Sequence, residues 1–379
     1  MILVIIPILA MLGLGFILPG KTPPRMKPFL GIAFCIFSLL FGVRWFISAE
    51  WFYPHADAIT HVRGQVDHLI HLPEWENKPL VILEGSSVTE FGIDQELLEK
   101  TLHEHGINAT VLKFSLPGAN HFERLFMLKL FIKKVVQIYP HHPFEKAPVI
   151  LLSEVFQSYD QNPLDHFFKE SNTLRSLVWL EPHNAFMAWK ALRASSQEKK
   201  NITWIMLEHL FLNRFAVGIF SALQPLNYNK KDWGFFPLKK TKGSFCYQKS
   251  KEAFEKVILG TSPDLLKNHT PPAGWMIYYQ ELFAQIAPHV HTLVFYAIPT
   301  LDIEEYQYQN AFRLSLPTHT MMLGPASPRF MKKLLDEKNW FDEVHPAGPG
   351  AYELTTWLAK KITKEWSEIL KMKWNMGEQ

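Results

Sequence analysis

The sequence predicts an α/β fold in which a parallel sheet is flanked by helices. Short, mainly apolar runs at 80–84, 109–114, 148–153 and 292–298 predict strands, and the continuous run at 80–84 is typical of a strand that is buried on both faces. Helical patterns stand between these runs, and strands that alternate with helices favour a parallel sheet. The expected arrangement is therefore three layers, with helices on both sides of the sheet.

The sequence also predicts the helices that flank this sheet. Asp94 can cap a helix that runs to about His105, where Gly106 stops it. A long amphipathic helix is predicted over 121–138, after the second strand, and the last helix over about 350–370.

Composition narrows the classes of protein that the chain can be. Its 379 residues, of which 47% are hydrophobic, are enough for one large domain or two small ones. The net charge is +3. The nearly balanced charge gives no case for a nucleic-acid partner. The two cysteines, Cys35 and Cys246, imply no disulfide framework.

The first fifty residues differ from the rest and predict a two-helix membrane anchor over 1–50. Residues 1–19 carry no charge, and 28–48 carry only Arg44, near their end. Runs of about 20 apolar residues can cross the hydrocarbon core of a bilayer. The basic loop between the runs, 20–27, should stay cytoplasmic, which places both termini and the remaining chain on the extracytoplasmic (periplasmic) side of the inner or plasma membrane. A single anchor or a cleaved leader is the alternative.

The rest of the chain divides into a connector over 51–78, which we expect to end in a helix, and an α/β domain over 79–379. Within this domain, about 160–275 interrupts the strand–helix rhythm with aromatic-rich helical patterns. We interpret this stretch as a helical insertion lying over the functional edge of the sheet, against the bilayer or as an ordinary helical cap.

Polar residues follow the ends of the predicted strands. In open parallel sheets, binding and catalytic sites lie at the carboxyl ends of the strands. Ser87 follows the first strand and Gly118 the second, while Asp342 and His345 precede the last helix. A serine hydroxyl becomes nucleophilic when a histidine takes its proton, and a carboxylate best orients that histidine. The backbone N–H groups of Ser87 and Gly118 can stabilise an oxyanion. Read separately, the Gly-Ser-Ser turn is most often a loop and Asp-x-x-His a helix cap.

Taken together, these motifs resemble the SGNH (GDSL-type) hydrolase superfamily, whose fold is a flavodoxin-like three-layer α/β domain. Gly85-Ser86-Ser87 is similar to the family's first block, Leu116-Pro-Gly118 to its second, and Asp342-Glu-Val-His345-Pro to its last. The resemblance implies that Ser87 is the nucleophile, His345 the base and Asp342 its partner, with Ser87 and Gly118 in the oxyanion hole. The family's third-block asparagine has no counterpart over 153–157, where Gln157 is the further candidate donor.

The anchored, outward-facing domain resembles the accessory proteins of membrane-bound O-acyltransferase systems. This resemblance implies a serine acyl enzyme that transfers an acyl (acetyl) group to an envelope polysaccharide, or hydrolyses esters on it, through an acyl-serine intermediate. Its expected partners are the bilayer and a polytopic membrane-bound O-acyltransferase, and no cofactor or metal site is indicated. Two alternatives stay open. One is a non-catalytic SGNH-like scaffold, and the other is a lipid esterase with an acyl groove lined by Trp179, Trp189, Trp204 and Phe220.

Overall fold

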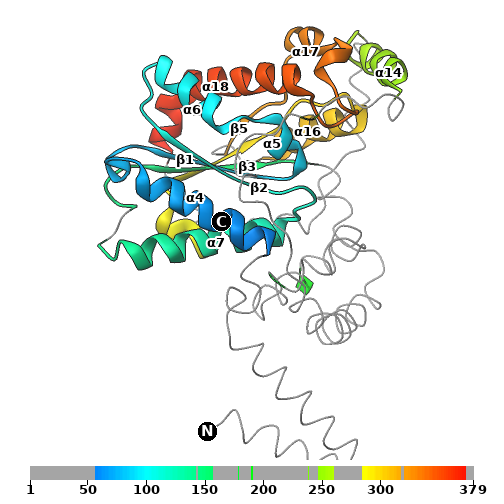
Figure 1. Ribbon diagram of the computed structural model, residues 1–379. Helices are drawn as coiled ribbons and strands as arrows, with labels where there is room; N and C mark the ends of the chain where they lie inside the picture. The colour runs from blue at the N-terminus through cyan, green and yellow to red at the C-terminus, as the bar shows by residue number, and fades with distance from the viewer. Residues whose placement is uncertain are drawn as a thin grey trace, which may run out of the picture.

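The chain forms an α/β fold built on a parallel sheet, as predicted (Figure 1). The computed structural model describes residues 56–141, 144–156, 246–259, 284–316 and 320–372, together with Val178, Trp189, Lys190 and Leu238. Within these residues the strands form one five-stranded sheet, and helices cover both of its faces.

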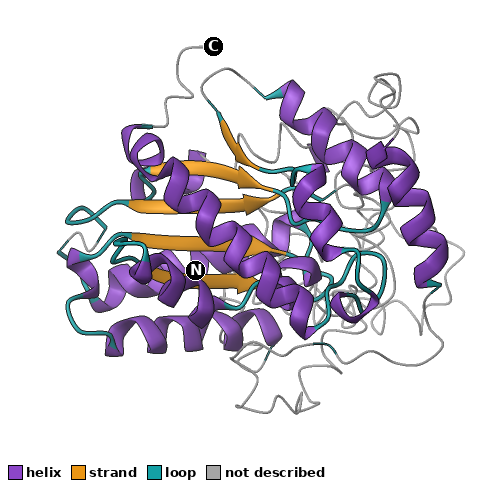
Figure 2. Ribbon diagram, turned by 90° about the horizontal axis from the view of Figure 1, so that it is seen from above, coloured by secondary structure: helices purple, strands orange, loops and turns teal. Residues whose placement is uncertain are grey.

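All neighbouring strands of this sheet are parallel, in the order β2-β1-β3-β4-β5 (Figure 2). The four predicted strands are confirmed, with ends within two residues of those expected. The short edge strand β5 was missed, because three residues are too few to show a pattern. The strands are β1 (Leu80–Gly85), β2 (Thr110–Ser115), β3 (Val149–Glu154), β4 (Thr292–Tyr296) and β5 (Met321–Leu323).

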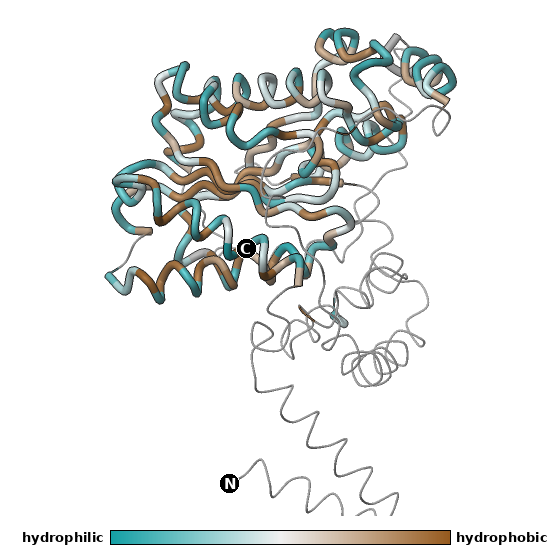
Figure 3. The backbone as a smooth tube through the Cα atoms, viewed as in Figure 1, coloured by the Kyte–Doolittle hydropathy of each residue, from teal (hydrophilic) through white to brown (hydrophobic). Residues whose placement is uncertain are grey.

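The register brings the carboxyl ends of the first three strands to the same edge. Gly85 at the end of β1 is paired with Ser115 at the end of β2, and Glu84 with Ser153 of β3. Loops that follow these strands therefore start side by side. Side chains alternate between the faces of the sheet, and because both faces are covered, the strands are apolar on both (Figure 3).

One face of the sheet is covered by α4 (Asp57–His71) and α7 (His121–Ile138), with Tyr308 and Phe312 of α16 (Ile303–Ser315) in the same core. The bounds of α7 agree with those predicted. Asn120 begins this helix by accepting a hydrogen bond from the Glu123 N–H at 3.0 Å.

The opposite face is covered by helices that follow β1 and by helices from the C-terminal third. They are α5 (Ser87–Gly92), α6 (Gln95–Glu104), α14 (Tyr247–Leu259), α17 (Pro328–Leu334) and α18 (Gly348–Lys371). Asp94 caps α6 through the Leu97 N–H at 3.0 Å, as predicted. Short 3-10 turns complete the described elements: η1 (Trp75–Asn77), η4 (Ala287–His289) and η5 (Glu337–Asn339).

The segment interpreted as a connector that ends in a helix, 51–78, contributes α4 to the core. Ile59, Val62 and Leu69 of this helix are fully buried. His61 lies against Lys113 of β2, with its Nε2 2.7 Å from the backbone carbonyl oxygen, and burial lowers the pKa of its imidazole. Because α4 packs in the core of the sheet, the α/β domain begins before residue 79.

Two predicted features fall mainly outside the described residues. The proposed anchor, 1–50, is one of them, and no helix within the described ranges is long and apolar enough to cross a membrane. The insertion, about 160–275, is the other. Its α14 packs against the domain, with the Phe254 ring 5.3 Å from that of Tyr306, and Leu238 forms a parallel bridge with Ala347.

Candidate active site

Ser87 is the first residue of α5, directly after the turn that ends β1. Ser86 is the helix cap, because its hydroxyl accepts a hydrogen bond from the Val88 N–H at 3.3 Å. The turn requires glycine at position 85, since a Cβ there would collide with the Thr89 side chain and press on the Glu154 carboxylate. This local sequence holds the Ser87 hydroxyl at the carboxyl edge of the sheet.

Asp342 and His345 lie in a tightly bonded loop before α18. Asp342 Oδ1 accepts hydrogen bonds from the backbone N–H groups of Val344, at 3.0 Å, and His345, at 2.7 Å. The His345 carbonyl accepts the Phe341 N–H at 2.9 Å, and the Glu343 carbonyl accepts the Leu301 N–H at 2.7 Å. The loop is therefore attached both to itself and to the segment after β4.

The structure brings together the three side chains that the sequence proposes for catalysis. His345 Nε2 lies 2.8 Å from the Ser87 hydroxyl, although the two residues are 258 positions apart. On the other side of the ring, His345 Nδ1 lies 2.8 Å from Asp342 Oδ2 and 3.0 Å from Oδ1. Since an ionised carboxylate only accepts hydrogen bonds, Nδ1 carries the proton and Nε2 can accept one from Ser87.

The electrostatic environment keeps the Asp342 carboxyl ionised. Burial raises its pKa, but the hydrogen bonds and charge of His345 lower the pKa by more than burial raises it. The pKa of the Asp342 carboxyl is therefore below its ordinary value. Phe91 of α5 packs its ring edge-on against His345, with the centroids 5.9 Å apart. The imidazole is therefore oriented by an anion at Nδ1 and contacted by an aromatic ring from α5, the helix that also carries Ser87.

Gly118 lies in the turn between β2 and α7, beside the end of β1. Its backbone φ is +72°, a conformation that favours glycine, and the Ala119 N–H closes the turn onto the Leu116 carbonyl at 3.0 Å. In the part of the chain that the structure describes, neither the Gly118 N–H nor the Ser87 N–H has an acceptor. Both donors are therefore available at the edge where the serine lies.

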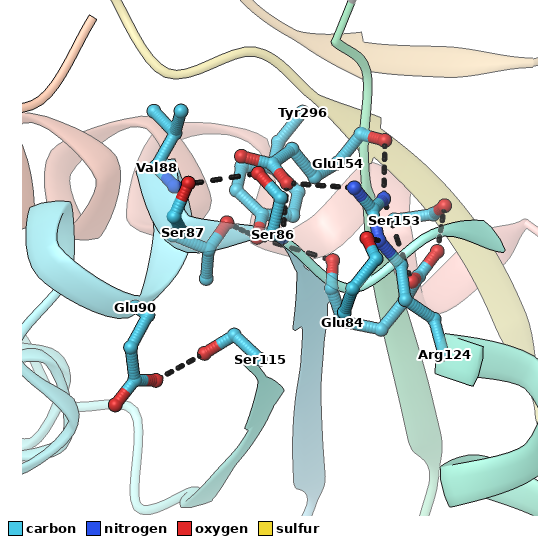
Figure 4. Close-up of polar contacts among 12 residues, drawn as sticks. Glu84, Ser86, Ser87, Val88, Glu90, Ser115, Arg124, Ser153, Glu154 and Tyr296 are labelled. Atoms are coloured by element: carbon cyan, nitrogen blue, oxygen red, sulfur yellow. Dashed lines mark hydrogen bonds and ion pairs between the residues drawn. The ribbon is translucent and has the colours of Figure 1, made fainter. Parts of the chain in front are cut away.

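The third-block position is occupied by an acid. Glu154, the last residue of β3, accepts a hydrogen bond from the Ser86 N–H, and its carboxylate also meets the guanidinium of Arg124 (Figure 4). The other proposed donor, Gln157, lies outside the described residues. Sequence reasoning missed Arg124 and Glu84, the two other charged members of this buried group. The signal in the sequence that could have indicated this group is a glutamate in one of the last two positions of each of two apolar strands, β1 and β3.

Of the aromatic residues proposed to line an acyl groove, only Trp189 is described, and it packs against the core beneath α4 and α7. No group of three His, Cys, Asp or Glu side chains able to hold a metal ion occurs among the described residues.

Serine, imidazole and carboxylate in this order form an arrangement that can transfer an acyl group through an acyl-serine. No protein-family model, curated protein or solved structure matches the chain. The functional conclusion therefore depends on the geometry of these residues.

Proposed function

We propose that this chain is a serine acyl enzyme of the SGNH type, with Ser87 as nucleophile, His345 as general base and Asp342 as its partner. One observation carries the proposal, namely the hydrogen-bonded series from the Ser87 hydroxyl through His345 to the Asp342 carboxylate. Each distance is short enough for proton transfer without rearrangement of the loop.

In the proposed acylation step, the Ser87 oxygen attacks the carbonyl carbon of an ester while His345 Nε2 takes the hydroxyl proton. Asp342 stabilises the imidazolium that forms. The Ser87 and Gly118 N–H groups donate to the developing oxyanion, and His345 returns its proton to the leaving alcohol as the tetrahedral adduct collapses. Ser87 then carries the acyl group as an ester.

In the second step an acceptor hydroxyl attacks the acyl-serine, with His345 again acting as base. If the acceptor is a sugar hydroxyl the reaction is O-acyl transfer, and if it is water the reaction is ester hydrolysis. We propose an envelope glycan as the substrate and a polytopic membrane-bound O-acyltransferase as the partner. The two apolar runs of residues 1–50 support this choice, because a tethered enzyme acts at a high local concentration of a membrane partner.

The topology also supports the assignment. The strand order β2-β1-β3-β4-β5 is that of flavodoxin-like sheets, in which ligands bind outside the carboxyl ends where the order reverses. Ser87 follows β1 and Glu154 ends β3, and these two strands flank the point of reversal.

A non-catalytic scaffold is the second candidate, and the observation that favours it is Glu154. A carboxylate accepts hydrogen bonds, so it cannot supply the donor that an asparagine brings to the family's oxyanion hole.

The deciding experiment is labelling of the purified full-length chain by a fluorophosphonate probe, which reacts with activated serines. The wild-type chain should be labelled, and Ser87→Ala should abolish the labelling, because the only oxygen placed against His345 Nε2 in the described part of the chain is then gone. Ser327→Ala is the control, since its hydroxyl caps the separate helix α17 at an exposed position and does not contact His345. A wild-type chain without label, or label retained in Ser87→Ala, contradicts the acyl-enzyme assignment.

A further inference from the structure

A buried charged cluster lies directly beneath the nucleophile's turn. It consists of Glu84, the residue before the last in β1, Glu154 at the end of β3 and Arg124 in the first turn of α7, and we call it the edge cluster. All three side chains are at most 1% exposed. Apolar residues of similar size would often give the fold equal or greater stability than a buried ionic group. The position of this cluster beside the proposed site therefore suggests a role other than stability.

Arg124 joins the segments that carry the proposed site. Its Nη2 donates to the Glu154 carboxylate at 3.1 Å, and its Nη1 to the Glu154 backbone carbonyl at 3.3 Å. Its Nε donates to the carbonyl of Ala119, the residue after Gly118, at 3.3 Å. One planar cation thus ties the end of β3 to the turn that holds the Gly118 N–H.

Glu154 extends this connection to the nucleophile. Its Oε2 accepts the Ser86 N–H as well as the guanidinium, and the same oxygen lies 3.0 Å from where a Cβ of Gly85 would be. The peptide group after Ser86 carries the Ser87 N–H, so the contact at Ser86 sets the orientation of that donor. The pair of Glu154 and Arg124 therefore contacts the turns that carry both backbone donors of the proposed oxyanion hole. Figure 4 shows the Glu154 side of this pair beside Ser86.

Glu84 touches the same cation without touching the turn's N–H groups. Its Oε2 is 3.7 Å from Arg124 Nη1, and its Oε1 accepts the Ser153 hydroxyl. The cluster thus holds two carboxyl groups for one guanidinium, and only one of them contacts the catalytic turn.

We propose that Glu154 is a positioning residue for the acyl-transfer reaction, which fixes the Ser87 and Gly118 N–H donors through Ser86 and Arg124. The inference rests on the proposed function and adds a role that Ser87, His345 and Asp342 do not fill. Glu154 occupies the strand end where the related family has an asparagine donor. Here it acts as an acceptor for the backbone, and it does not touch the substrate.

Three substitutions separate this role from that of a counter-ion. Glu154→Gln keeps the reach and an oxygen acceptor but removes the charge. Glu154→Asp keeps the charge but withdraws the acceptor by one methylene, and Glu154→Met keeps the length with a methyl at the tip. The rate of Ser87 labelling by fluorophosphonate, and kcat and KM for p-nitrophenyl acetate, are measured on the full-length chain, with a thermal melt to verify folding.

If Glu154 positions the turn, Glu154→Gln should stay within about tenfold of the wild-type rate, because one neutral hydrogen bond replaces a charge-assisted one. Glu154→Asp and Glu154→Met should lose on the order of 100-fold in kcat at little change in KM, which is the effect of an oxyanion donor displaced by about 1 Å. Either of these two variants decides the matter if the other does not fold.

A counter-ion role gives the opposite order, since Asp preserves the charge beside Arg124 and Gln does not. The proposal is overturned if the labelling rate and kcat of Glu154→Asp exceed those of Glu154→Gln. It is also overturned if folded Glu154→Asp and Glu154→Met react at the wild-type rate. Both outcomes leave the acyl-enzyme assignment intact. Glu84→Asp and Glu84→Gln are the matched controls, which contact the same guanidinium and should retain wild-type labelling. Absence of Ser87 labelling in the wild-type chain overturns both proposals.

Discussion

At the scale of single residues, one carboxylate determines how the imidazole of the proposed site is used. Asp342 holds its loop through two backbone N–H groups with Oδ1 and holds the ring through Nδ1. Because its pKa lies below the ordinary range, it stays ionised in mildly acidic solution and continues to fix the tautomer of His345.

Asp342→Asn should therefore lower kcat by about 10⁴-fold while preserving the fold, because an amide supports the wrong imidazole tautomer. Asp336→Asn provides the control, since Asp336 is an exposed carboxylate that caps a turn with Oδ1 3.2 Å from the Lys338 nitrogen. The measurement is kcat for p-nitrophenyl acetate in both variants. Residual activity of Asp342→Asn above a tenth of wild type would remove Asp342 from the proposed mechanism.

At the scale of elements, the helix that carries Ser87 is too short to be stable alone. Helix α5 has 6 residues, and isolated helices of this length do not form in water. Lys113 of β2 stabilises its C-terminal end by donating to the carbonyls of Glu90, at 3.0 Å, and Ile93, at 3.1 Å, and by pairing with the Glu90 carboxylate at 3.3 Å. A cation at a helix C-terminus is also favoured by the helix dipole.

Lys113→Met should lower the free energy of unfolding by about 3 kcal/mol, because it leaves the largely buried Glu90 without its cation. The comparison is Lys100→Met, which removes an exposed pair with Glu104 and should cost less than about 1 kcal/mol. Urea unfolding of both variants measures the difference. Equal effects of the two substitutions would show that Lys113 does not hold α5 in place.

At the scale of the whole molecule, the centre of the sheet contains more buried acid than base. Burial raises the pKa of Glu84, against the opposing effects of Arg124, Ser153 and His121, while the neighbouring Glu154 raises it further. The folded chain then holds a proton on Glu84 that the unfolded chain releases near the ordinary value of 4.5. This group's contribution to stability is complete below that pH and is lost as the pH rises toward the folded-state pKa.

Glu84→Gln removes this titration. The free energy of unfolding of the variant, relative to that of the wild type, should therefore increase as the pH rises. We expect the gap between the two proteins to be larger at about pH 7 than at about pH 4.5, as measured by urea unfolding at both values. Glu104→Gln, at an exposed position, should show no such trend. Parallel pH dependences for wild type and Glu84→Gln would contradict a raised Glu84 pKa.

Much of the fold could be predicted because its signals are local. The strands β1 to β4 are short, mainly apolar runs, and α6 and α7 begin at side-chain caps one residue before the helix, at Asp94 and Asn120. A helix was expected before the first strand, but its packing against α7 depends on tertiary contacts and not on a local pattern. The edge strand β5 has three residues, which is below the length at which alternation can be seen.

The class of fold and the residue types of the proposed site could be inferred from local sequence, because strand burial, helix caps and the Asp-x-x-His spacing depend on neighbours along the chain. The contact of His345 with Ser87, and the link that Arg124 makes between Glu154 and the turn of Gly118, follow from the tertiary structure alone. These contacts join segments 258 and 30 positions apart, and their geometry follows from the parallel register that brings three strand ends to one edge. Such a register is set by packing of the whole core, which no local pattern encodes.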